Sequence, residues 1–399
     1  MQTKHKVLFQ SLSLGKLALN NRLALAPTHV GMGGDRGTVT DQILCYYYAR
    51  AKAGLGLVIV EATGVTGRYA FTPGLGLGAA SDHSIPGLRD LASVIHWGNA
   101  KAVVQLMAGQ GAQALTHQGK RALVGPSAVP ALIQREGLPK AIRGFEKMNP
   151  EQPRPLEKSE IEDLKASFIR AAERVKKAGF DGVEIHGAHG YLLCQFTSPY
   201  FNRRHDDYGG SPERRWRLSV DLIQDIKEKI GQDFVVGYRF SAREGIPGGL
   251  ELDESVKMAK AIQGAGADYL SVSHGCYAVA SDTFPKGEDT FTKDAAEIRK
   301  EVSIPVMCAN FQDPDRAAAA IEEGSADIIA LSRPLLADPL WPEKVKEGRS
   351  EEIIHCIRCY ECARAAVVEH LPVRCPVNPK LGFERFDPQC FPRPGGKIG

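Results

Sequence analysis

Hydrophobic positions along the chain fall into short runs that are separated by longer stretches with helical spacing. Each run is rich in Val, Ile, Leu and Ala, and a Gly- or Pro-containing loop and then an amphipathic segment follow it. Eight runs predict β-strands at residues 23–26, 57–62, 102–106, 182–186, 234–240, 269–273, 305–309 and 327–331. Helices are predicted between them at residues 41–53, 84–99, 159–178, 212–230, 252–265, 293–301 and 314–323. Side chains that favour helix N-termini lie at or near four of these starts: Asp41, Ser159, Ser211 and Asp313.

This alternation predicts an α/β protein with a (β/α)8 TIM barrel. A doubly wound sheet is the alternative, but no G-x-G-x-x-G follows the first strand, where a dinucleotide-binding unit would have it. A barrel carries its chemistry at the C-terminal ends of its strands, so the residues just after each run are the candidates for function.

Composition and charge narrow the class of protein. The formal net charge of +3 and the pI near 8.3 are too mild to argue for a nucleic-acid partner. Five arginines alternate with acidic residues and are expected to form a solvated helix entrance: Arg203, Arg204, Arg214, Arg215 and Arg217. No apolar run has the length of a signal-peptide core or of a membrane span.

Five cysteines are scattered along the chain: Cys45, Cys194, Cys276, Cys308 and Cys390. Their odd number and wide spacing do not suggest a disulfide framework, which favours a reducing compartment. The sequence therefore predicts a cytoplasmic protein without a membrane partner.

Residues at or just after the predicted strand ends, most of them polar, should converge on one mouth of the barrel. They are Pro27, Thr28 and His29, Ala62, Gln105, His186 and His189 with Tyr191, Arg239, Asn310 and Phe311, and Ser332 with Arg333. Loops after the last two strands of a barrel often bind phosphate, and Arg333 would add a cationic fork there. Gln105 could pair with the pyrimidine edge of a flavin, and Arg239 could stabilise negative charge on its reduced ring. The set suits flavin mononucleotide, although His186 and His189 could equally be metal ligands.

Four further cysteines near the C-terminus form a compact pattern. Cys356, Cys359 and Cys362 read C-x-x-C-x-x-C, and Cys375 follows after twelve residues. Three thiolates on one short segment can each reach a different corner of an iron–sulfur cubane, and the fourth can close the cage. A four-cysteine zinc site is the alternative, but zinc ribbons usually bring two separate C-x-x-C pairs to one ion. The pattern predicts a [4Fe-4S] cluster.

Several segments resemble the Old Yellow Enzyme family of FMN-dependent oxidoreductases. The longest runs from Asp181 through D-G-V-E-I-H-G-A-H-G-Y and continues to Ser211, and shorter ones lie around Arg22, Tyr46, Gln105 and residues 332–339. With the cysteine segment, the chain is similar to the branch that holds 2,4-dienoyl-CoA reductase, enoate and bile-acid reductases, and trimethylamine dehydrogenase. The resemblance implies an FMN-binding barrel at residues 1–348 and a [4Fe-4S]-binding segment with a truncated linker at residues 349–399.

In that branch, the residues that match His186 and His189 bind the substrate oxygen, and the one that matches Tyr191 donates a proton to the carbon next to the carbonyl. Two imidazole donors would polarise an enone carbonyl, reduced flavin would deliver hydride to the β-carbon, and a phenol would complete the addition. The resemblance thus implies reduction of an activated C=C bond in an enoyl-CoA, enoate or enone. The bland alternative for Tyr191 is a packed ring at a strand-to-helix junction.

The chain departs from the family at several positions. His29 stands where trimethylamine dehydrogenase has the cysteine that binds flavin covalently, so the FMN is expected to be non-covalent. Ala366 stands where that enzyme closes its amine cage with an aromatic ring, which removes a cation–π wall. Ala108 replaces a histidine that many relatives have after the third strand, and the loops 110–155 and 276–291 should shape the pocket.

Family members usually continue into FAD- and NAD(P)H-binding domains, whereas this sequence stops at Gly399. This suggests a separate electron-transfer partner, such as a flavoprotein subunit, a ferredoxin or an electron-transfer flavoprotein, or else a piece of a longer chain. Two other functions stay open. One is an amine dehydrogenase or N-demethylase that passes electrons outward, and the other is a non-enzymatic electron-transfer subunit. Assembly into a homo-oligomer is also left open.

Overall fold

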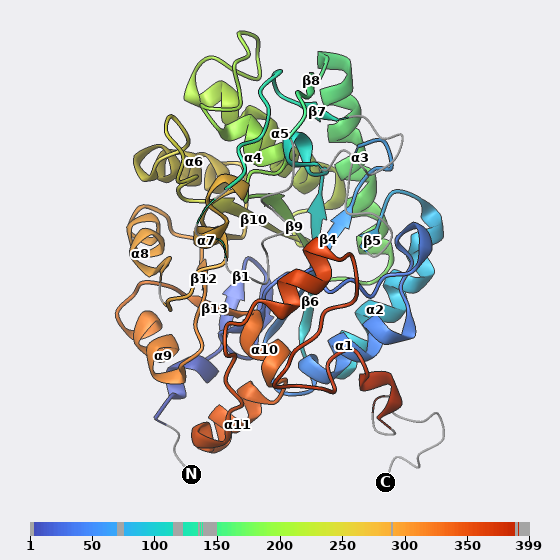
Figure 1. The fold of residues 1–399 in the computed structure, drawn as a ribbon, viewed down its shortest axis with the longest axis vertical. Helices are drawn as coiled ribbons and strands as arrows, with labels where there is room; N and C mark the ends of the chain where they lie inside the picture. Colours follow the sequence, from blue (N-terminus) through green and yellow to red (C-terminus); the bar gives the residue numbers. More distant parts are fainter. Residues whose placement is uncertain are drawn as a thin grey trace.

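Eight parallel strands form a closed barrel at the centre of the molecule (Figure 1). The structure is a computed structural model that describes residues 4–69, 76–114, 123–134, 136, 138, 150–288, 290–387 and 390. The barrel strands are β3 (Leu23–Leu25), β4 (Leu57–Gly64), β6 (Lys101–Met107), β9 (Gly182–Gly187), β10 (Val235–Ser241), β11 (Tyr269–Ser273), β12 (Val306–Ala309) and β13 (Ile328–Leu331). Strand β3 pairs with β4 on one side and with β13 on the other, which closes the sheet. The predicted barrel is confirmed, and each predicted strand lies within two residues of the observed one.

Helices surround the barrel, as the sequence pattern predicts (Figure 1). The seven predicted helices are α1 (Asp41–Ala51), α2 (Ile85–Trp97), α3 (Lys158–Lys177), α5 (Pro212–Ile230), α6 (Leu252–Gly264), α8 (Thr292–Glu301) and α9 (Pro314–Glu322). Short helices that the pattern did not reveal are α4 (Leu192–Thr197), α7 (Ala280–Thr283), α10 (Arg333–Ala337), α11 (Trp341–Glu347) and α12 (Glu361–Ala363). Short strands outside the barrel wall are β1 (Leu12–Leu14), β2 (Leu17–Leu19), β5 (Leu77–Gly78), β7 (Val124–Gly125) and β8 (Arg154–Pro155).

Two of the four predicted helix caps are confirmed, and two are shifted. The side chains of Ser211 and Asp313 accept hydrogen bonds from backbone N–H groups in the first turns of α5 and α9. Helix α1 is capped by Thr40 instead of Asp41, because the extended backbone at Thr40 lets its hydroxyl accept from the N–H of Ile43. Helix α3 begins before Ser159, where the side chains of Glu157 and Glu160 form a reciprocal capping box.

The barrel interior is filled by hydrophobic side chains near the N-terminal ends of the strands, and it becomes polar towards the mouth at their C-terminal ends. Inward-facing residues from the strands, such as Val103 and Met307, form one hydrophobic cluster with Leu14 and Leu19 of the antiparallel β1–β2 hairpin. The hairpin therefore closes the N-terminal end of the barrel. A second and larger cluster fills the layer between the strands and the helices.

The C-terminal segment crosses the front of the barrel and then runs back to α1 (Figure 1). Three contacts tie it to that helix. The amide of Gln42 donates to the carbonyl of Gly382, Arg50 pairs with Glu384 at 3.1 Å, and Cys45 forms a disulfide with Cys390. The disulfide corrects the expectation from cysteine spacing, since two of the five scattered cysteines are paired. Their separation of 345 residues in the sequence hid the pairing. None of the helices in the described ranges is both long and apolar enough to cross a bilayer.

Gly237 in β10 provides a test of interior packing. A Cβ atom at this position would lie 2.1 Å from the buried ring of Tyr269 on the neighbouring strand. We expect Gly237→Ala to lower the free energy of unfolding by about 1–3 kcal/mol, because the ring is fully buried and its hydroxyl is bonded to Glu184. Gly264→Ala is the matched control, since a Cβ there contacts nothing within 4 Å and alanine favours the helix. Denaturant unfolding of both variants checks the difference, and equal stabilities would contradict it.

Candidate active site at the barrel mouth

One cavity at the C-terminal ends of the strands brings together all thirteen residues predicted to bind a cofactor or substrate. They are Pro27, Thr28, His29, Ala62, Gln105, His186, His189, Tyr191, Arg239, Asn310, Phe311, Ser332 and Arg333. The β11 loop adds Tyr277, Phe284 and Phe291, and the C-terminal segment adds Tyr360 and Ala366. Ala108 does not belong to the described wall, and much of the loop 110–155 lies outside the described residues. The structure thus places the predicted residues around one space, while their individual roles remain predictions.

A buried carboxylate, Glu184, organises the floor of the cavity. Its Oε1 accepts a hydrogen bond of 2.7 Å from the amide of Gln105, and its Oε2 accepts one of 3.0 Å from the hydroxyl of Tyr269. Burial raises the pKa of Glu184, and the nearby Arg239 guanidinium opposes this shift. One amide N–H of Gln105 is therefore committed to Glu184, and its carbonyl oxygen is left as an acceptor. Sequence reasoning missed Glu184, although a charged residue two positions before His186 on a buried strand was an available signal.

His186 near the end of β9 and His189 just after it are both neutral. Burial and then the positive charge of Arg239 lower the pKa of His186 to about 3, and the same causes hold the pKa of His189 well below its ordinary value. The Nδ1 of His186 accepts from the backbone N–H of Ala188 at 3.4 Å, which leaves the proton on Nε2. His189 pairs through Nε2 with the hydroxyl of Ser273 at 2.7 Å. Each ring therefore has one atom fixed by the protein, and the rings lie 5.2 Å apart between centroids.

Tyr191 stands next to both histidines at the start of α4. Its ring centroid is 5.2 Å from that of His186, and its hydroxyl lies 3.1 Å from the hydroxyl of Tyr277. Burial raises the pKa of Tyr191, while the hydrogen bond with Tyr277 lowers it. Tyr191 is thus a protonated phenol in the wall of the cavity at neutral pH. Sequence reasoning did not identify Tyr277, since its loop carries no recognisable pattern.

Two guanidinium groups offer unsatisfied donors within the cavity wall. The Nε of Arg239 and the Nη1 of Arg333 are buried, and neither has a hydrogen-bond partner among the described residues. The other terminal nitrogen of Arg333 donates to the carbonyl of Pro285 and to Asn310. Buried cationic donors without partners are unfavourable unless an anion accepts from them. Thr28 and Ser332 share a hydroxyl contact of 2.7 Å beside Arg333 and add two more groups that suit a phosphate.

His29 is held by a second buried carboxylate. Its Nδ1 lies 2.9 Å from the Oε2 of Glu61, an oxygen that also accepts from the backbone N–H of Val30. The backbone N–H of Glu61 in turn donates to the hydroxyl of Tyr47 at 2.8 Å. The buried carboxylate of Glu61 therefore fixes the orientation of the His29 ring in the cavity wall.

Comparison with known proteins agrees with this geometry. The profile of the NADH:flavin oxidoreductase / NADH oxidase family, whose flavin is FMN, matches residues 7–352. This range contains every barrel strand and all thirteen predicted residues of the cavity wall. The chain belongs to this family. It is a flavin-dependent oxidoreductase.

Individual relatives of this flavin oxidoreductase have different activities. It is 37% identical to an NADH oxidase of Thermoanaerobacter brockii over 94% of this chain and 56% of the relative. It is 32% identical to a cinnamate reductase of Clostridium sporogenes over 96% of this chain and 59% of the relative. The structure resembles 2-naphthoyl-CoA reductase, with a TM-score of 0.87 and 28% identity over 96% of this chain and 58% of that one. It also resembles histamine dehydrogenase from Rhizobium sp. 4-9, with a TM-score of 0.84 and 30% identity over 96% of this chain and 53% of that one. The chain thus spans a little more than half the length of these relatives.

The four C-terminal cysteines of the flavin oxidoreductase line a second, smaller cavity. Cys356, Cys359, Cys362 and Cys375 all border it. Within the described residues, no three Cys, His, Asp or Glu side chains converge closely enough to hold a metal ion. Sulfur donors spaced around a cavity are what a multi-iron cluster needs, because each thiolate binds a different iron. Burial and then the neighbouring Cys356 raise the pKa of Cys362 to about 12.

The two cavities share a wall. Arg333, Leu336, Tyr360 and Cys362 border both of them. Tyr360 has a left-handed backbone conformation with φ of 64°, and its hydroxyl donates to the carbonyl of Phe284 in the β11 loop. The cysteine segment is therefore docked directly against the mouth of the barrel.

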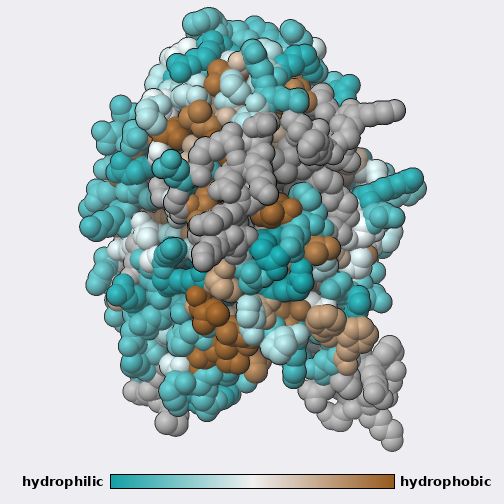
Figure 2. Space-filling view, viewed as in Figure 1, coloured by the Kyte–Doolittle hydropathy of each residue, from teal (hydrophilic) through white to brown (hydrophobic). Residues whose placement is uncertain are grey.

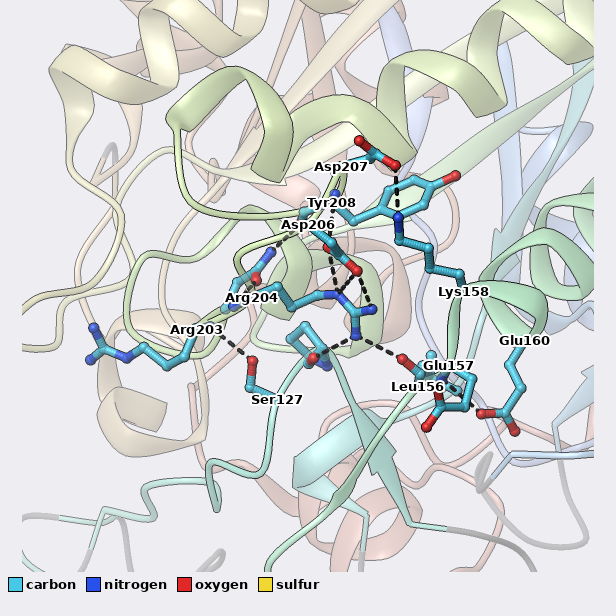
Figure 3. Close-up of polar contacts among 12 residues, drawn as sticks. Ser127, Leu156, Glu157, Lys158, Glu160, Arg203, Arg204, Asp206, Asp207 and Tyr208 are labelled. Atoms are coloured by element: carbon cyan, nitrogen blue, oxygen red, sulfur yellow. Dashed lines mark hydrogen bonds and ion pairs between the residues drawn. The ribbon is translucent and has the colours of Figure 1, made fainter.

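The arginine-rich stretch near the start of α5 is structural. Figure 3 shows Arg204 between the loop before α3 and Asp206, while the side chain of Arg203 points away. One nitrogen of Arg204 lies 2.6 Å from Asp206, and another donates to the carbonyls of Pro126 and Leu156. Arg215 is buried and pairs with Glu254 at 2.6 Å. The expected solvated entrance is therefore wrong for Arg204 and Arg215, whose charges are satisfied within the protein.

Hydrophobic side chains are exposed around the cysteine segment. Brown atoms gather in the lower half of the face shown in Figure 2, where Figure 1 draws this segment. The exposed large side chains of this part of the chain are Leu340, Ile354, Ile357, Leu371, Phe383 and Phe386. The surface beside the four cysteines is therefore less polar than the rim of helices.

The neutral histidines predict acid-sensitive stability. A buried His186 that stays uncharged down to about pH 3 binds fewer protons than the unfolded chain, whose histidines titrate near pH 6.5, so stability is lost as the pH falls through this window. Between pH 6.5 and 5, the wild type should lose about 2 kcal/mol more free energy of unfolding than His186→Asn. Urea unfolding at both pH values measures this difference.

The exposed His83 supplies the matched control, because His83→Asn should keep the pH dependence of the wild type. An identical pH dependence in wild type and His186→Asn would show that His186 is charged in the folded protein.

Proposed function

We propose that this flavin oxidoreductase reduces an activated C=C bond in an enoyl-CoA, enoate or enone. The observation that carries the proposal is the charge of the cavity. Three arginines, Arg239, Arg333 and Arg358, line it, and none of the described lining residues is Asp or Glu. Such a wall favours a substrate whose oxygen becomes negative during reaction, since positive charge and N–H donors stabilise that oxygen.

His186 and His189 would bind the substrate oxygen. Both are neutral, so they act as hydrogen-bond donors without giving up a proton. The Nε2–H of His186 is fixed by the contact of Nδ1 with the backbone of Ala188. With its Nε2 accepting from the Ser273 hydroxyl, His189 would donate through Nδ1. The two donors would stabilise charge that develops on the carbonyl oxygen and lower the barrier to addition at the β-carbon.

Tyr191 would supply the proton. Its hydroxyl lies in the same wall as the two histidines, so a substrate oxygen bound by the histidines places the adjacent carbon near the phenol. Burial keeps the pKa of this phenol above its ordinary value, and the group stays protonated at neutral pH. FMN, when bound and reduced, supplies the hydride for the β-carbon.

The residues around the cavity fit a non-covalent FMN. Gln105 would accept from the pyrimidine edge, and the unpartnered Nε of Arg239 would donate to it. Arg333 with Thr28 and Ser332 would hold the phosphate, and Asn310 with Phe311, Pro27 and Ala62 would complete the wall. His29 has no thiol that could attach to the flavin, and its ring is held by Glu61.

Amine oxidation is the second candidate, and the likeness to histamine dehydrogenase supports it. Tyr277, Phe284 and Phe291 could contact a cationic amine through their ring faces. Ala366 lies in the cavity wall and offers no ring, and an ammonium group would lie among arginines without a described carboxylate. We therefore favour the reductase.

The four C-terminal cysteines would hold a [4Fe-4S] cluster that exchanges electrons with a separate carrier. Cys362 borders both cavities, so a cluster there would lie beside the flavin. The exposed apolar side chains around the segment would let a carrier approach. The carrier, a flavoprotein, ferredoxin or electron-transfer flavoprotein, stays a prediction, as do the cytoplasmic location and the oligomeric state.

Two variants should separate proton transfer from substrate binding. Tyr191→Phe removes the proposed acid, so reduced enzyme should still bind substrate while its reoxidation slows by about 10²–10⁴-fold. His186→Ala removes a donor to the substrate oxygen and should mainly weaken binding. Anaerobic stopped-flow with cinnamate, simple enones and a set of enoyl-CoAs measures both effects.

If every substrate reoxidised the reduced Tyr191→Phe variant at the wild-type rate, Tyr191 would not be the proton donor. If no enone or enoate reoxidises the wild type while secondary or tertiary amines reduce it, amine oxidation replaces C=C reduction as the proposed function.

The cysteine assignment predicts a brown protein. After anaerobic purification, we expect about four iron and four acid-labile sulfide per flavin, because each thiolate holds one iron of a cubane. Replacing Cys362 by Ser should reduce the iron content, whereas Cys308→Ser should not, since Cys308 lies buried in β12 away from the second cavity. A single zinc per chain and no sulfide would overturn the assignment.

A further inference from the structure

A second tyrosine, Tyr277, contacts the proposed acid. It begins the short 3-10 turn Tyr277–Val279 after β11 and lines the cavity. Its hydroxyl lies 3.1 Å from that of Tyr191, and the two rings meet edge to face with centroids 5.8 Å apart. Two phenols in hydrogen-bond contact inside one cavity form a pair that the proposed mechanism does not yet use.

Gln113 fixes the distance between the two tyrosines. Its Oε1 accepts from the backbone N–H of Tyr277 at 2.8 Å, and its Nε2 donates to the carbonyl of His189 at 2.8 Å. Gly190 makes this close approach possible, since a Cβ there would lie 2.6 Å from Gln113 and 2.7 Å from Cys276. The loop that carries Tyr191 and the loop that carries Tyr277 are therefore joined by one buried amide.

Gln110 makes a second contact with Tyr277. The side chain of Gln110 bonds to Tyr277 and lowers its pKa, as an N–H donor to the phenol oxygen does. With that oxygen accepting from Gln110, the Tyr277 proton is available to Tyr191. Burial raises the pKa of both phenols, and the contact between them raises the pKa of Tyr277 further while it lowers that of Tyr191. Either hydroxyl can donate while both phenols are protonated, but once Tyr191 has lost its proton only Tyr277 can donate across this contact.

The geometry points to Tyr277 as a positioning residue that orients Tyr191 towards the substrate and stabilises its phenolate during proton transfer. This role rests on the proposed reductase function. In the step, the O–H bond of Tyr191 breaks, the proton forms a C–H bond at the carbon next to the carbonyl, and the electron pair stays on the Tyr191 oxygen. The Tyr277 hydroxyl donates to this anion and keeps its own proton. Solvent then returns a proton to Tyr191.

Tyr277→Phe tests the role, because it removes the hydroxyl and keeps the ring that packs against Tyr191. Reduced enzyme should bind the substrate with a dissociation constant within about threefold of wild type, and its reoxidation should slow by about 10-fold, as expected for losing a hydrogen bond to a charged group. The variant should also change the pH profile. Tyr191 loses a donor that stabilises its anion, so the pKa of Tyr191 rises. The alkaline limb of the profile of reoxidation rate against pH then moves to higher pH. A purely structural role would lower the rate without moving the limb.

A double-variant comparison separates action through Tyr191 from independent action. In the Tyr191→Phe background, Tyr277→Phe should change the reoxidation rate by less than about twofold, since contacting groups that act as a unit are not additive. The full loss in that background would overturn the proposal. Tyr48→Phe on the outer helix α1 is the matched control and should behave as wild type.

The outcomes also distinguish this role from the proposed function. If enones reoxidise the wild type and Tyr277→Phe keeps the wild-type rate and pH profile, only the role of Tyr277 falls. If no enone or enoate reoxidises the wild type, both fall. Should Tyr277→Phe not fold, Gln110→Met removes the amide that polarises Tyr277 and should shift the alkaline limb in the same direction. An unmoved limb in that variant would count against the role.

Discussion

Strand β3 hydrogen-bonds to β4 on one side and to β13 on the other, and this pairing closes the barrel. Closure of a parallel sheet forces the C-terminal ends of all eight strands to meet around one axis. Side chains as distant in the sequence as Thr28 and Ser332 therefore lie within hydrogen-bond distance. The cavity, its polar wall and the docking of the C-terminal segment all depend on this constraint.

Burial then sets the chemical state of the groups that the barrel collects. Glu184 on β9 accepts from Gln105 on β6 and from Tyr269 on β11, and the charge of Arg239 opposes the rise in its pKa that burial causes. The same guanidinium, together with burial, keeps His186 and His189 neutral. A site with cationic donors, neutral imidazoles and a protonated phenol is suited to a substrate that gains negative charge on oxygen.

The C-terminal segment connects this site to the cysteine cavity. Arg358 pairs with Glu288 at 2.8 Å, and Tyr360 donates to the carbonyl of Phe284, so the segment rests on the same β11 loop that carries Tyr277. The guanidinium carbon of Arg333 lies 5.8 Å from the centre of the Tyr360 ring in the shared wall. The β11 loop therefore contacts the cysteine segment and also lines the cavity at the barrel mouth.

The sequence alone determined the barrel, its strands and the residues at its mouth. Short apolar runs that alternate with amphipathic helices allow few other folds, and strand ends identify the mouth without coordinates. The resemblance around Asp181–Ser211 added the family. Local pattern also located the cysteine segment, because its spacing is a property of neighbouring residues.

Only the tertiary structure decided which distant residues meet. It brought Glu184 to Gln105 across a strand pair, joined Gln113 to Tyr277 over 164 residues, and paired Cys45 with Cys390. It also showed that Arg333 and Cys362 share a wall between two cavities. The charge of Glu184 on a buried strand is visible in the sequence, but its partner is not, and the other contacts have no sequence signal, because each depends on loop paths and on packing between elements. The protonation of His186 and His189 depends in turn on the burial that this packing creates.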